Sequence, residues 1–408
     1  MTRSFLFLQG VCSPFFSRLG EKLKAQGQDV SKINFNGGDA AFWRAGQATP
    51  WAGSVDGLAD FYQDYYQTHG ITDIVLFGDQ RPVHKPAIEL ARQNGLRTHV
   101  YEEGYFRPFW LTLERSGVNA HSLLPKNPEF YLEAGRKVPN YRNGETFGGS
   151  FSARAWHDVL YHVCSLRNRW AFPEYVSHAP HSVWTEYSGY VKRAVRLGGR
   201  KRRDADAIAS LVRKDRVFYL LPLQLDSDTQ IRLHSCFENM SHFMDRVMRS
   251  FAAKAPADAW LVIKNHPLDP GLVHHERNAM ALAKELDIQH RVVFLESGNL
   301  PTLLSHATGV ITVNSTVGGS ALWHARPLIA LGQPIYDMAG LTFQGQLDEF
   351  WQELQMPDMR LFHHFRNVVI HTTQINGGFY SEDSIRMAVE RSVERLMAEK
   401  SPLEALSA

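Results

Sequence analysis

The feature that most constrains the fold is an alternation, along the whole chain, of short apolar runs with longer amphipathic segments. The apolar runs lie at residues 4–10, 32–36, 71–78 and 98–104, and again at 216–224, 260–265, 291–296, 309–314 and 327–331. Segments with helical periodicity separate them, for example at residues 16–26, 85–93 and 272–286. This alternation is typical of βαβ units, so we predict α/β domains built on parallel sheets.

The length of the chain bounds the number of domains. With 408 residues, 44% of them hydrophobic, the chain is long enough for two domains of ordinary size. We predict a first domain over residues 1–205, with an aromatic-rich helical insertion at about 120–205, and a second domain over 206–345. We expect residues 346–408 to form helices that pack back across the domains.

Charge and cysteine content exclude several classes of protein. The formal net charge is only +2, so overall charge indicates no polyanionic partner. Cys12, Cys164 and Cys236 are scattered without a CxxC spacing, which argues against a disulfide framework or a zinc site and favours a reducing, cytoplasmic setting. The first apolar run is too short for a signal sequence, and no apolar run reaches about 18 residues, so we expect no membrane-spanning segment.

Polar residues follow most of the predicted strands. In open parallel sheets, ligands bind outside the carboxyl ends of the strands. In the first half of the chain these ends carry Gly10, Asp79, Gln80, Glu102 and Glu103. In the second half they carry residues 224–228, His266, Glu296, Ser297 and residues 314–319. We therefore expect the chemistry of the protein at these positions.

Residues 260–267 place a cation and an imidazole at the mouth of a strand. Four apolar residues precede Lys264, and Pro267 fixes the turn after His266. Lys264 and His266 together suit a phosphate group. The alternative interpretation is a partly buried histidine that only satisfies its own loop.

A second turn suited to phosphate follows the strand at 309–314. Asn314, Ser315, Thr316 and Gly318 open a helix, whose first N–H groups and dipole favour an anion. The alternative is an ordinary N-cap. Two such turns in the same half of the chain favour a nucleotide-donor domain there.

An acidic turn ends the strand at 98–104. Of the adjacent carboxylates of Glu102 and Glu103, one can bond to the structure while the other faces a cleft and acts as an acid or base. Gly104 would let a ligand approach closely. The alternative is a solvated strand end.

Residues 221–232 are the richest in functional groups. They include Gln224, Asp226, Asp228, Gln230 and Arg232. The Asp-x-Asp spacing fits a metal site for a nucleotide diphosphate, and either aspartate could be a nucleophile or stabilise charge. The alternative is an Asx-rich turn in which Asp228 caps the next helix.

Together these stretches resemble a family of bacterial glycosyltransferases. The acidic turn, the His-Pro turn and the Ser/Thr helix start resemble GT-B transferases, whose two Rossmann-like domains face a central cleft and which use CMP-activated keto sugar acids. Residues 221–232 narrow the resemblance to the capsular polysaccharide synthesis and export family, and within it to single-module retaining β-Kdo transferases. The resemblance implies transfer of Kdo from CMP-Kdo to a (lyso)phosphatidylglycerol acceptor, which starts the β-Kdo linker of a capsular polysaccharide.

The resemblance also implies a role for each motif. The residues expected to bind the donor are Gln224, Arg232, Lys264, His266, Asn314, Ser315, Thr316 and Gly318. Asp228 would be the nucleophile of a double displacement, with Asp226 as the second candidate. Glu103 would be the general acid/base, supported by Glu102. The residues expected at the acceptor are Gly10, Asp79, Gln80 and Arg107, and Arg107 or Arg232 would pair with the Kdo carboxylate.

We expect no metal or other cofactor, because the CMP leaving group carries one phosphate that protein cations can neutralise. The expected partners are CMP-Kdo, a lipid acceptor of the phosphatidylglycerol type, the cytoplasmic membrane surface and other capsule synthesis or export proteins, with no nucleic acid. The protein would lie peripherally on the inner face of the inner membrane. The basic run at residues 192–203 either contacts anionic lipid or is a solvated linker.

Two other functions remain open at this point. One is a GT-B transferase or epimerase that uses another nucleotide sugar, which would favour longer Gly-rich diphosphate turns than the pairs at residues 37–38 and 318–319. The other is a non-catalytic capsule-assembly or export protein that keeps the fold. Glu103, Asp228 and His266 argue against the second alternative.

Overall fold

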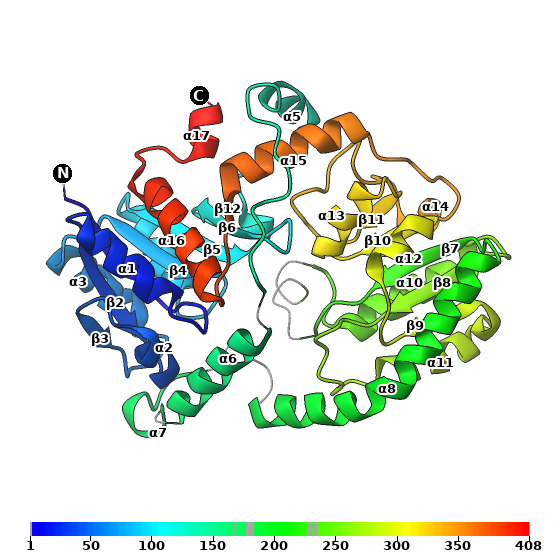
Figure 1. The fold of residues 1–408 in the computed structure, drawn as a ribbon, viewed down its shortest axis with the longest axis horizontal. Coiled ribbons are helices and arrows are strands. Elements are labelled where there is room, and N and C mark those ends of the chain that lie inside the picture. Colours follow the sequence, from blue (N-terminus) through cyan, green and yellow to red (C-terminus); the bar gives the residue numbers. More distant parts are fainter. Residues whose placement is uncertain are drawn as a thin grey trace. The chain divides into compact units, whose positions relative to one another are not determined.

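The chain folds into two compact units (Figure 1). The computed structural model describes residues 2–149, 151–166, 168–176, 183–226, 231 and 235–407. Unit 1 comprises Met1–Leu124, Arg136–His178 and Arg366–Ala408, and unit 2 comprises Pro125–Gly135 and Ala179–Phe365. In this division the long helix α8 (Val183–Arg213) belongs to unit 2, and residues 366–408 return to unit 1. The expected domain bounds at residues 205 and 345 stay predictions.

The sheet of unit 1 has the strand order β12-β6-β5-β4-β1-β2-β3. Its strands are β1 (Ser4–Phe7), β2 (Asp29–Asn34), β3 (Ala48–Pro50), β4 (Asp73–Phe77), β5 (Arg97–Glu103), β6 (Trp110–Arg115) and β12 (Gln374–Asn376). Strands β1 to β5 pair in parallel, whereas β6 and β12 are antiparallel. Strands β3, β6 and β12 were not among those predicted from the sequence. Strands β3 and β12 have three residues each and form the two edges of the sheet, and the six-residue β6 lies next to β12.

Helices cover both faces of this sheet. They are α1 (Phe15–Ala25) and α16 (Glu382–Met397) on one face, and α3 (Leu58–Thr68) and α4 (Lys85–Gln93) on the other. Phe5 and Phe7 of β1 belong to the core under α1 and α16, while Leu6 and Leu8 belong to the core under α3 and α4. Side chains alternate along a strand, so one apolar run supplies both cores. In Figure 1, α16 runs beside α1 although the two are far apart in the sequence.

Unit 2 has a sheet that is parallel throughout, with the order β11-β10-β7-β8-β9. Its strands are β7 (Phe218–Pro222), β8 (Trp260–Lys264), β9 (Val292–Leu295), β10 (Gly309–Thr312) and β11 (Leu328–Ala330). The accompanying helices include α10 (Met240–Lys254), α11 (His275–Glu285), α12 (Leu300–His306), α13 (Thr316–Trp323) and α14 (Leu347–Phe350). Trp351 lies in the core, where its indole N–H donates to Ser250 Oγ at 2.8 Å.

Both sheets share one strand order. Read as β3-β2-β1-β4-β5 and β9-β8-β7-β10-β11, each begins in the middle, extends to one side and then to the other. In such sheets the crevice for a ligand lies where the direction reverses, between β1 and β4 and between β7 and β10. The predicted fold class, α/β with two Rossmann-like domains and a helical insertion, is confirmed. That the two sheets face a common cleft stays a prediction.

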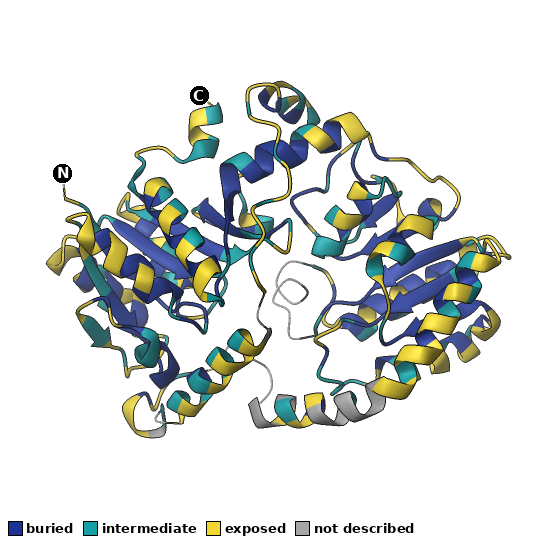
Figure 2. Cartoon of the chain, viewed as in Figure 1, coloured by how far each residue is buried: buried dark blue, intermediate teal, exposed yellow. Residues whose placement is uncertain are grey.

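The helical insertion of unit 1 contains α6 (Phe151–Ser165) and α7 (Asn168–Ala171). Helix α6 packs against α2 (Gly37–Phe42), where a Cβ at Gly37 would overlap the carbonyl oxygen of Cys164. The glycine pair at residues 37–38 therefore serves helix packing. The other side of α6 exposes Trp156 and Val163, and Figure 2 shows how much of this helix is exposed. Among the described residues, no helix is long and apolar enough to cross a bilayer.

A buried polar cluster lies at the amino-terminal ends of β4 and β5. The Asp73 carboxylate accepts from Arg3 Nε at 2.8 Å and lies 2.8 Å from His99 Nε2. Burial lowers the pKa of His99 to about 4, so the folded ring is neutral near pH 7. Burial by itself would raise the pKa of Asp73, but hydrogen bonds from His99 and Arg3 lower it to about 2.

This cluster should make the stability of unit 1 depend on pH. Both folded pKa values lie below the unfolded ones, so the stabilisation is complete above about pH 6.5. The contribution of His99 is lost as the pH falls from about 6.5 to about 4, and that of Asp73 as it falls further towards about 2. His99 contributes on the order of 3 kcal/mol to this loss. We expect His99→Gln, which keeps a donor for Asp73, to flatten the fall in unfolding free energy between about pH 6.5 and 4. Urea unfolding at several pH values measures this, and an equally steep fall in the variant would contradict the assignment.

Candidate functional site

A pair of side-chain amides joins the two strands at the switch point of unit 2. Gln224, just after β7, donates from Nε2 to Asn314 Oδ1 at 3.1 Å, and its Oε1 accepts from the Asn314 N–H at 3.3 Å. Because β8 pairs with the other side of β7, the carboxyl ends of β7, β8 and β10 lie next to one another. The structure therefore brings together the turns that carry the predicted donor residues.

Lys264 is the last residue of β8 and is only 8% exposed. Its ammonium group donates to the carbonyl of Asn265 at 3.3 Å. Burial lowers the pKa of Lys264, the nearby Arg193 lowers it further, and Asp204 opposes both effects. Burial thus destabilises the charged form of this lysine, and a neighbouring anion, such as a phosphate, would stabilise it.

His266 is held by its neighbours in the turn that follows β8. Its N–H donates to Asn265 Oδ1 at 2.8 Å, and its Nδ1 accepts from the Leu268 N–H at 3.1 Å. A neutral ring with Nδ1 as acceptor carries its proton on Nε2. His266 is half-buried, and a ring that accepts at Nδ1 in this way can present its Nε2–H to an anion.

The turn between β10 and α13 has the predicted N-cap. Ser315 Oγ accepts from the Val317 N–H at 3.1 Å, and Thr316 is the first residue of the helix. The ordinary N-cap interpretation therefore describes Ser315 correctly, while the helix dipole still favours an anion at this end. A Cβ at Gly318 would overlap the hydroxyl of Tyr336, which donates to the carbonyl of Ser315 at 2.6 Å. Gly318 thus allows Tyr336 to hold the start of the helix.

Asp226 bridges two elements of unit 2. Its Oδ1 accepts from the Met240 N–H at 2.8 Å, at the start of α10, and its Oδ2 lies 3.2 Å from His275 Nε2. Both carboxylate oxygens are thus engaged with the protein, which suits a structural bridge better than a nucleophile. Asp228 and Arg232, the other charged residues predicted in this stretch, lie outside the described residues.

In unit 1, the acidic turn ends β5. Glu102 Oε1 accepts from the Glu103 N–H at 2.9 Å, so this carboxylate helps to fix the turn. The side chain of Glu103 is 28% exposed and lies 4.0 Å from Arg154 Nη1 of α6. Of the two predicted carboxylates, Glu103 is therefore placed next to a cation and Glu102 next to the backbone.

The insertion supplies residues that the sequence interpretation missed. The guanidinium of Arg154 lies over the ring of Tyr380, 4.9 Å from its centroid. Burial raises the pKa of Tyr380, and the nearby Glu103 raises it further, so the phenol stays protonated. Two turns further along α6, the Tyr161 hydroxyl accepts from Gln9 Nε2 at 3.0 Å. The spacing of Arg154, Asp158 and Tyr161 on one face of a helix is the signal that could have found them.

Most of the residues predicted at the acceptor have protein partners. Asp79 Oδ2 accepts from the Val118 N–H at 3.3 Å and lies 3.0 Å from His121 Nδ1, which Gln80 also contacts. The carbonyl of Gly10 accepts from Arg81. Arg107 is exposed in the loop between β5 and β6.

Gly104 is required by the backbone of unit 1 itself. A Cβ at this position would overlap the carbonyl oxygen of Trp110, the first residue of β6. The close approach expected from this glycine is therefore to the neighbouring strand.

Comparison with known proteins relates the whole chain to capsule formation. Residues 72–380 match the family described as capsule polysaccharide biosynthesis protein. The capsule polysaccharide export protein KpsS of Escherichia coli is 36% identical over 381 residues, covering 93% of this chain and 97% of that protein. The capsule polysaccharide modification protein LipB of Neisseria meningitidis serogroup B is 37% identical over 391 residues, covering 93% of this chain and 92% of that protein.

One similar solved structure is Thermosulfurimonas dismutans KpsC, described as a beta Kdo 2,7 transferase. It is 14% identical, with a TM-score of 0.46, and the match covers 96% of this chain and 100% of that one. The matches to KpsS and LipB combine high coverage with a much higher sequence identity. On the strength of the family match and of these relatives, the chain belongs to the capsule polysaccharide biosynthesis protein family.

Proposed function

We propose that this protein transfers Kdo from CMP-Kdo to a hydroxyl group of a (lyso)phosphatidylglycerol acceptor, and so starts the β-Kdo linker of a capsular polysaccharide. The observation that carries the proposal is the set of phosphate-suited groups around the switch point of unit 2. These are the buried ammonium of Lys264, the imidazole of His266 and the start of α13 at Thr316. Membership of the capsule family supports the assignment to capsule assembly.

The charge in this set suits a nucleoside monophosphate leaving group. One buried lysine, one histidine and one helix N-terminus can stabilise the charge that develops on a single phosphate as the sugar departs. We therefore propose that CMP leaves without a metal ion. The preorganised turns cost little reorganisation during the reaction, because Asn265 and Ser315 already hold them.

The proposed reaction is a double displacement with retention. The Asp228 carboxylate attacks the anomeric carbon of Kdo, the bond from that carbon to the phosphate oxygen breaks, and CMP leaves with the electron pair. The acceptor hydroxyl then attacks the same carbon, the ester to Asp228 breaks, and Glu103 takes the hydroxyl proton. Asp228 is preferred to Asp226 because the structure engages both oxygens of Asp226 elsewhere.

The partners follow from this chemistry. The acceptor is a membrane lipid, so we propose that the protein works peripherally at the inner face of the inner membrane, near other capsule synthesis and export proteins. The names of the relatives favour one other function. KpsS is called an export protein, which suits a non-catalytic role in capsule assembly. A mixture of CMP-Kdo, lipid acceptor and this protein that forms no product would favour that alternative.

Donor binding should depend on the protonation of Lys264. Because the pKa of this lysine is lowered, affinity for CMP should fall as the pH rises through a value below the ordinary lysine pKa of about 10.4. We expect the loss to reach about tenfold to a hundredfold, the range for a charged hydrogen bond. Calorimetric titration of CMP from about pH 7, where its phosphate is ionised, to about pH 10 measures it.

One variant tests the assignment of the pH dependence to Lys264. Lys264→Gln should bind CMP weakly and with little dependence on pH over the same range, because no proton is left to lose. A separate comparison tests the nucleotide: UDP should bind more weakly than CMP to the wild-type protein. A pH dependence that is unchanged in Lys264→Gln would contradict the role of this lysine.

The nucleophile can be identified by mass spectrometry. After incubation with CMP-Kdo and no acceptor, we expect the peptide that contains Asp228 to carry one Kdo group. Asp226→Asn is the matched control and should still form the adduct, whereas Asp228→Asn should not. Glu103→Gln should form the adduct but turn over about a hundredfold to ten-thousandfold more slowly, because the second step has lost its base. An adduct on a different residue would refute the assignment.

A further inference from the structure

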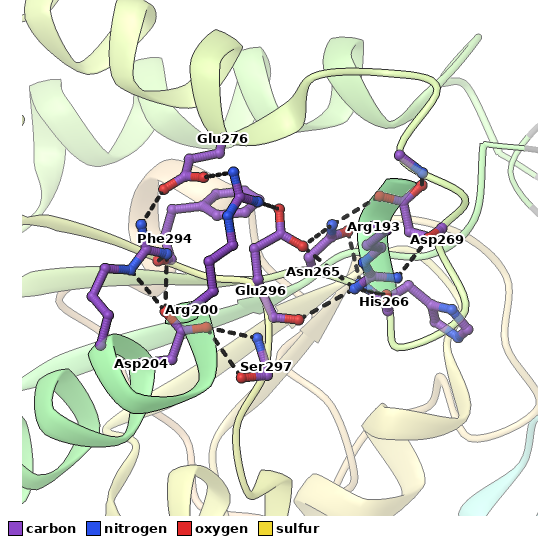
Figure 3. A network of polar contacts seen from close by, with 12 residues as sticks. Arg193, Arg200, Asp204, Asn265, His266, Asp269, Glu276, Phe294, Glu296 and Ser297 are labelled. Carbon is purple, nitrogen blue, oxygen red and sulfur yellow. Dashed lines mark hydrogen bonds and ion pairs between the residues drawn. The ribbon is translucent and has the colours of Figure 1, made fainter. Parts of the chain in front are cut away.

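Three arginines of α8, at positions 193, 200 and 203, contact other elements of unit 2. Arg200 pairs with Glu296 at 2.9 Å and with Glu276 at 3.3 Å. Arg203 pairs with Glu276 at 2.6 Å and with Asp204 at 2.9 Å. Figure 3 shows these side chains forming a continuous network between α8, the ends of β8 and β9, and α11. Arg193, Arg200 and Arg203 of the basic run thus have protein partners within unit 2. Whether the run also contacts lipid stays open.

Arg193 is the member of this network that touches the His-Pro turn. Its Nη1 donates to the carbonyls of Pro267 at 2.9 Å and Asp269 at 2.5 Å. Its Nη2 donates to the carbonyls of His266 at 3.1 Å and Glu296 at 3.3 Å, and lies 3.4 Å from the Glu296 carboxylate. The side chain is only 12% exposed. One guanidinium group therefore joins three carbonyls of the turn to the end of β9.

This geometry requires an arginine. The guanidinium group is planar and presents its donors in a fixed fork, so two nitrogens can each reach two carbonyls at once. A lysine would bring the same charge on a single nitrogen and could not span the turn. A lysine would leave some of these partly buried carbonyls, such as that of Asp269, without their donor, which costs stability.

A second set of bonds closes the turn from the inside. Asn265 Nδ2 donates to Asp269 Oδ2 at 2.8 Å and to Glu296 Oε2 at 3.2 Å. The Asp269 N–H donates to the carbonyl of His266 at 3.1 Å. Glu296 is itself 9% exposed and is held by Arg193 and Arg200. The shape of the turn thus depends on α8 as well as on the residues of the turn.

We propose that Arg193 is a positioning residue for the donor phosphate site, because it fixes from α8 the turn that presents Lys264 and His266. The inference rests on the proposed function for the identity of the anion, but the clamp on the turn is independent of it. Arg193 also places positive charge behind the carbonyls of the turn, which reduces their repulsion of an incoming phosphate. Helix α8 is thereby part of the donor site although none of its described side chains needs to touch the donor.

The test compares Arg193→Gln with Arg193→Lys and with Arg200→Gln in the full-length protein. Arg200→Gln is the matched control, because it removes an arginine from the same helix and network that bonds to no atom of the His-Pro turn, and Glu296 keeps its contacts with Arg193 and Asn265. Three measurements are made: calorimetric affinity for CMP, amide hydrogen exchange over residues 265–271, and the donor KM and kcat for transfer. Arg193→Lys keeps the charge and serves if the glutamine variant does not fold.

We expect Arg193→Gln to weaken CMP binding about tenfold or more and to speed exchange in the turn by a similar factor. The donor KM should rise more than kcat falls, because the loss is in holding the phosphate. Arg193→Lys should recover part of the affinity but not the slow exchange. Arg200→Gln should stay within about threefold of the wild type in CMP affinity.

Wild-type affinity in Arg193→Gln, or an equal loss in Arg200→Gln, would overturn the proposal. A fall in kcat with an unchanged donor KM would also overturn it. If the wild-type protein binds no CMP and transfers no Kdo, the proposed function is wrong. The exchange data then decide by themselves whether Arg193 holds the turn.

Discussion

Where a parallel strand ends, the main-chain N–H and C=O groups of the following turn have no neighbouring strand to bond to. This constraint organises the turns at the carboxyl ends of the strands of unit 2. Each turn at the switch point of unit 2 meets it with a side chain from elsewhere. Gln224 accepts from the main-chain N–H of Asn314 across β7 and β10, and Arg193 donates to carbonyls of the turn after β8. The same bonds hold the turns that carry His266 and Ser315. The rigidity of these turns and the proposed affinity for an anion would then have one origin.

Much of this arrangement could be predicted from the sequence because its signals are local. Apolar runs that end in polar residues predicted the central strands. The rule that ligands bind at the carboxyl ends of such strands then pointed to Lys264, His266 and Ser315. The contribution of α8 could not be predicted. Arg193 lies more than seventy residues before its acceptors, and in the sequence its basic neighbours look the same whether they face water or carbonyls.

A sequence pattern that suits a ligand also suits close packing, and several predicted site residues show this. Asp226, the second candidate for the nucleophile, bridges α10 and His275. Gly104 and Gly318 stand where a ligand would come near, yet the atoms that require their small size belong to Trp110 and Tyr336. Arg154 shows the converse, since a residue of an apparently separate insertion lies beside Glu103. Only the three-dimensional contacts separate these cases.

The sheet of unit 1 is closed by a strand from the far end of the chain. Strand β12 pairs with β6, and α16 packs beside α1, after all of unit 2 has intervened in the sequence. On the ribosome, unit 2 is therefore complete before the edge of β6 receives its partner. Until then the edge of β6 has unpaired backbone groups, and the apolar face of the sheet that α16 covers is exposed. Other chains can bind to both. The order of synthesis thus makes unit 1 the part of this protein that most depends on protection while it is being made.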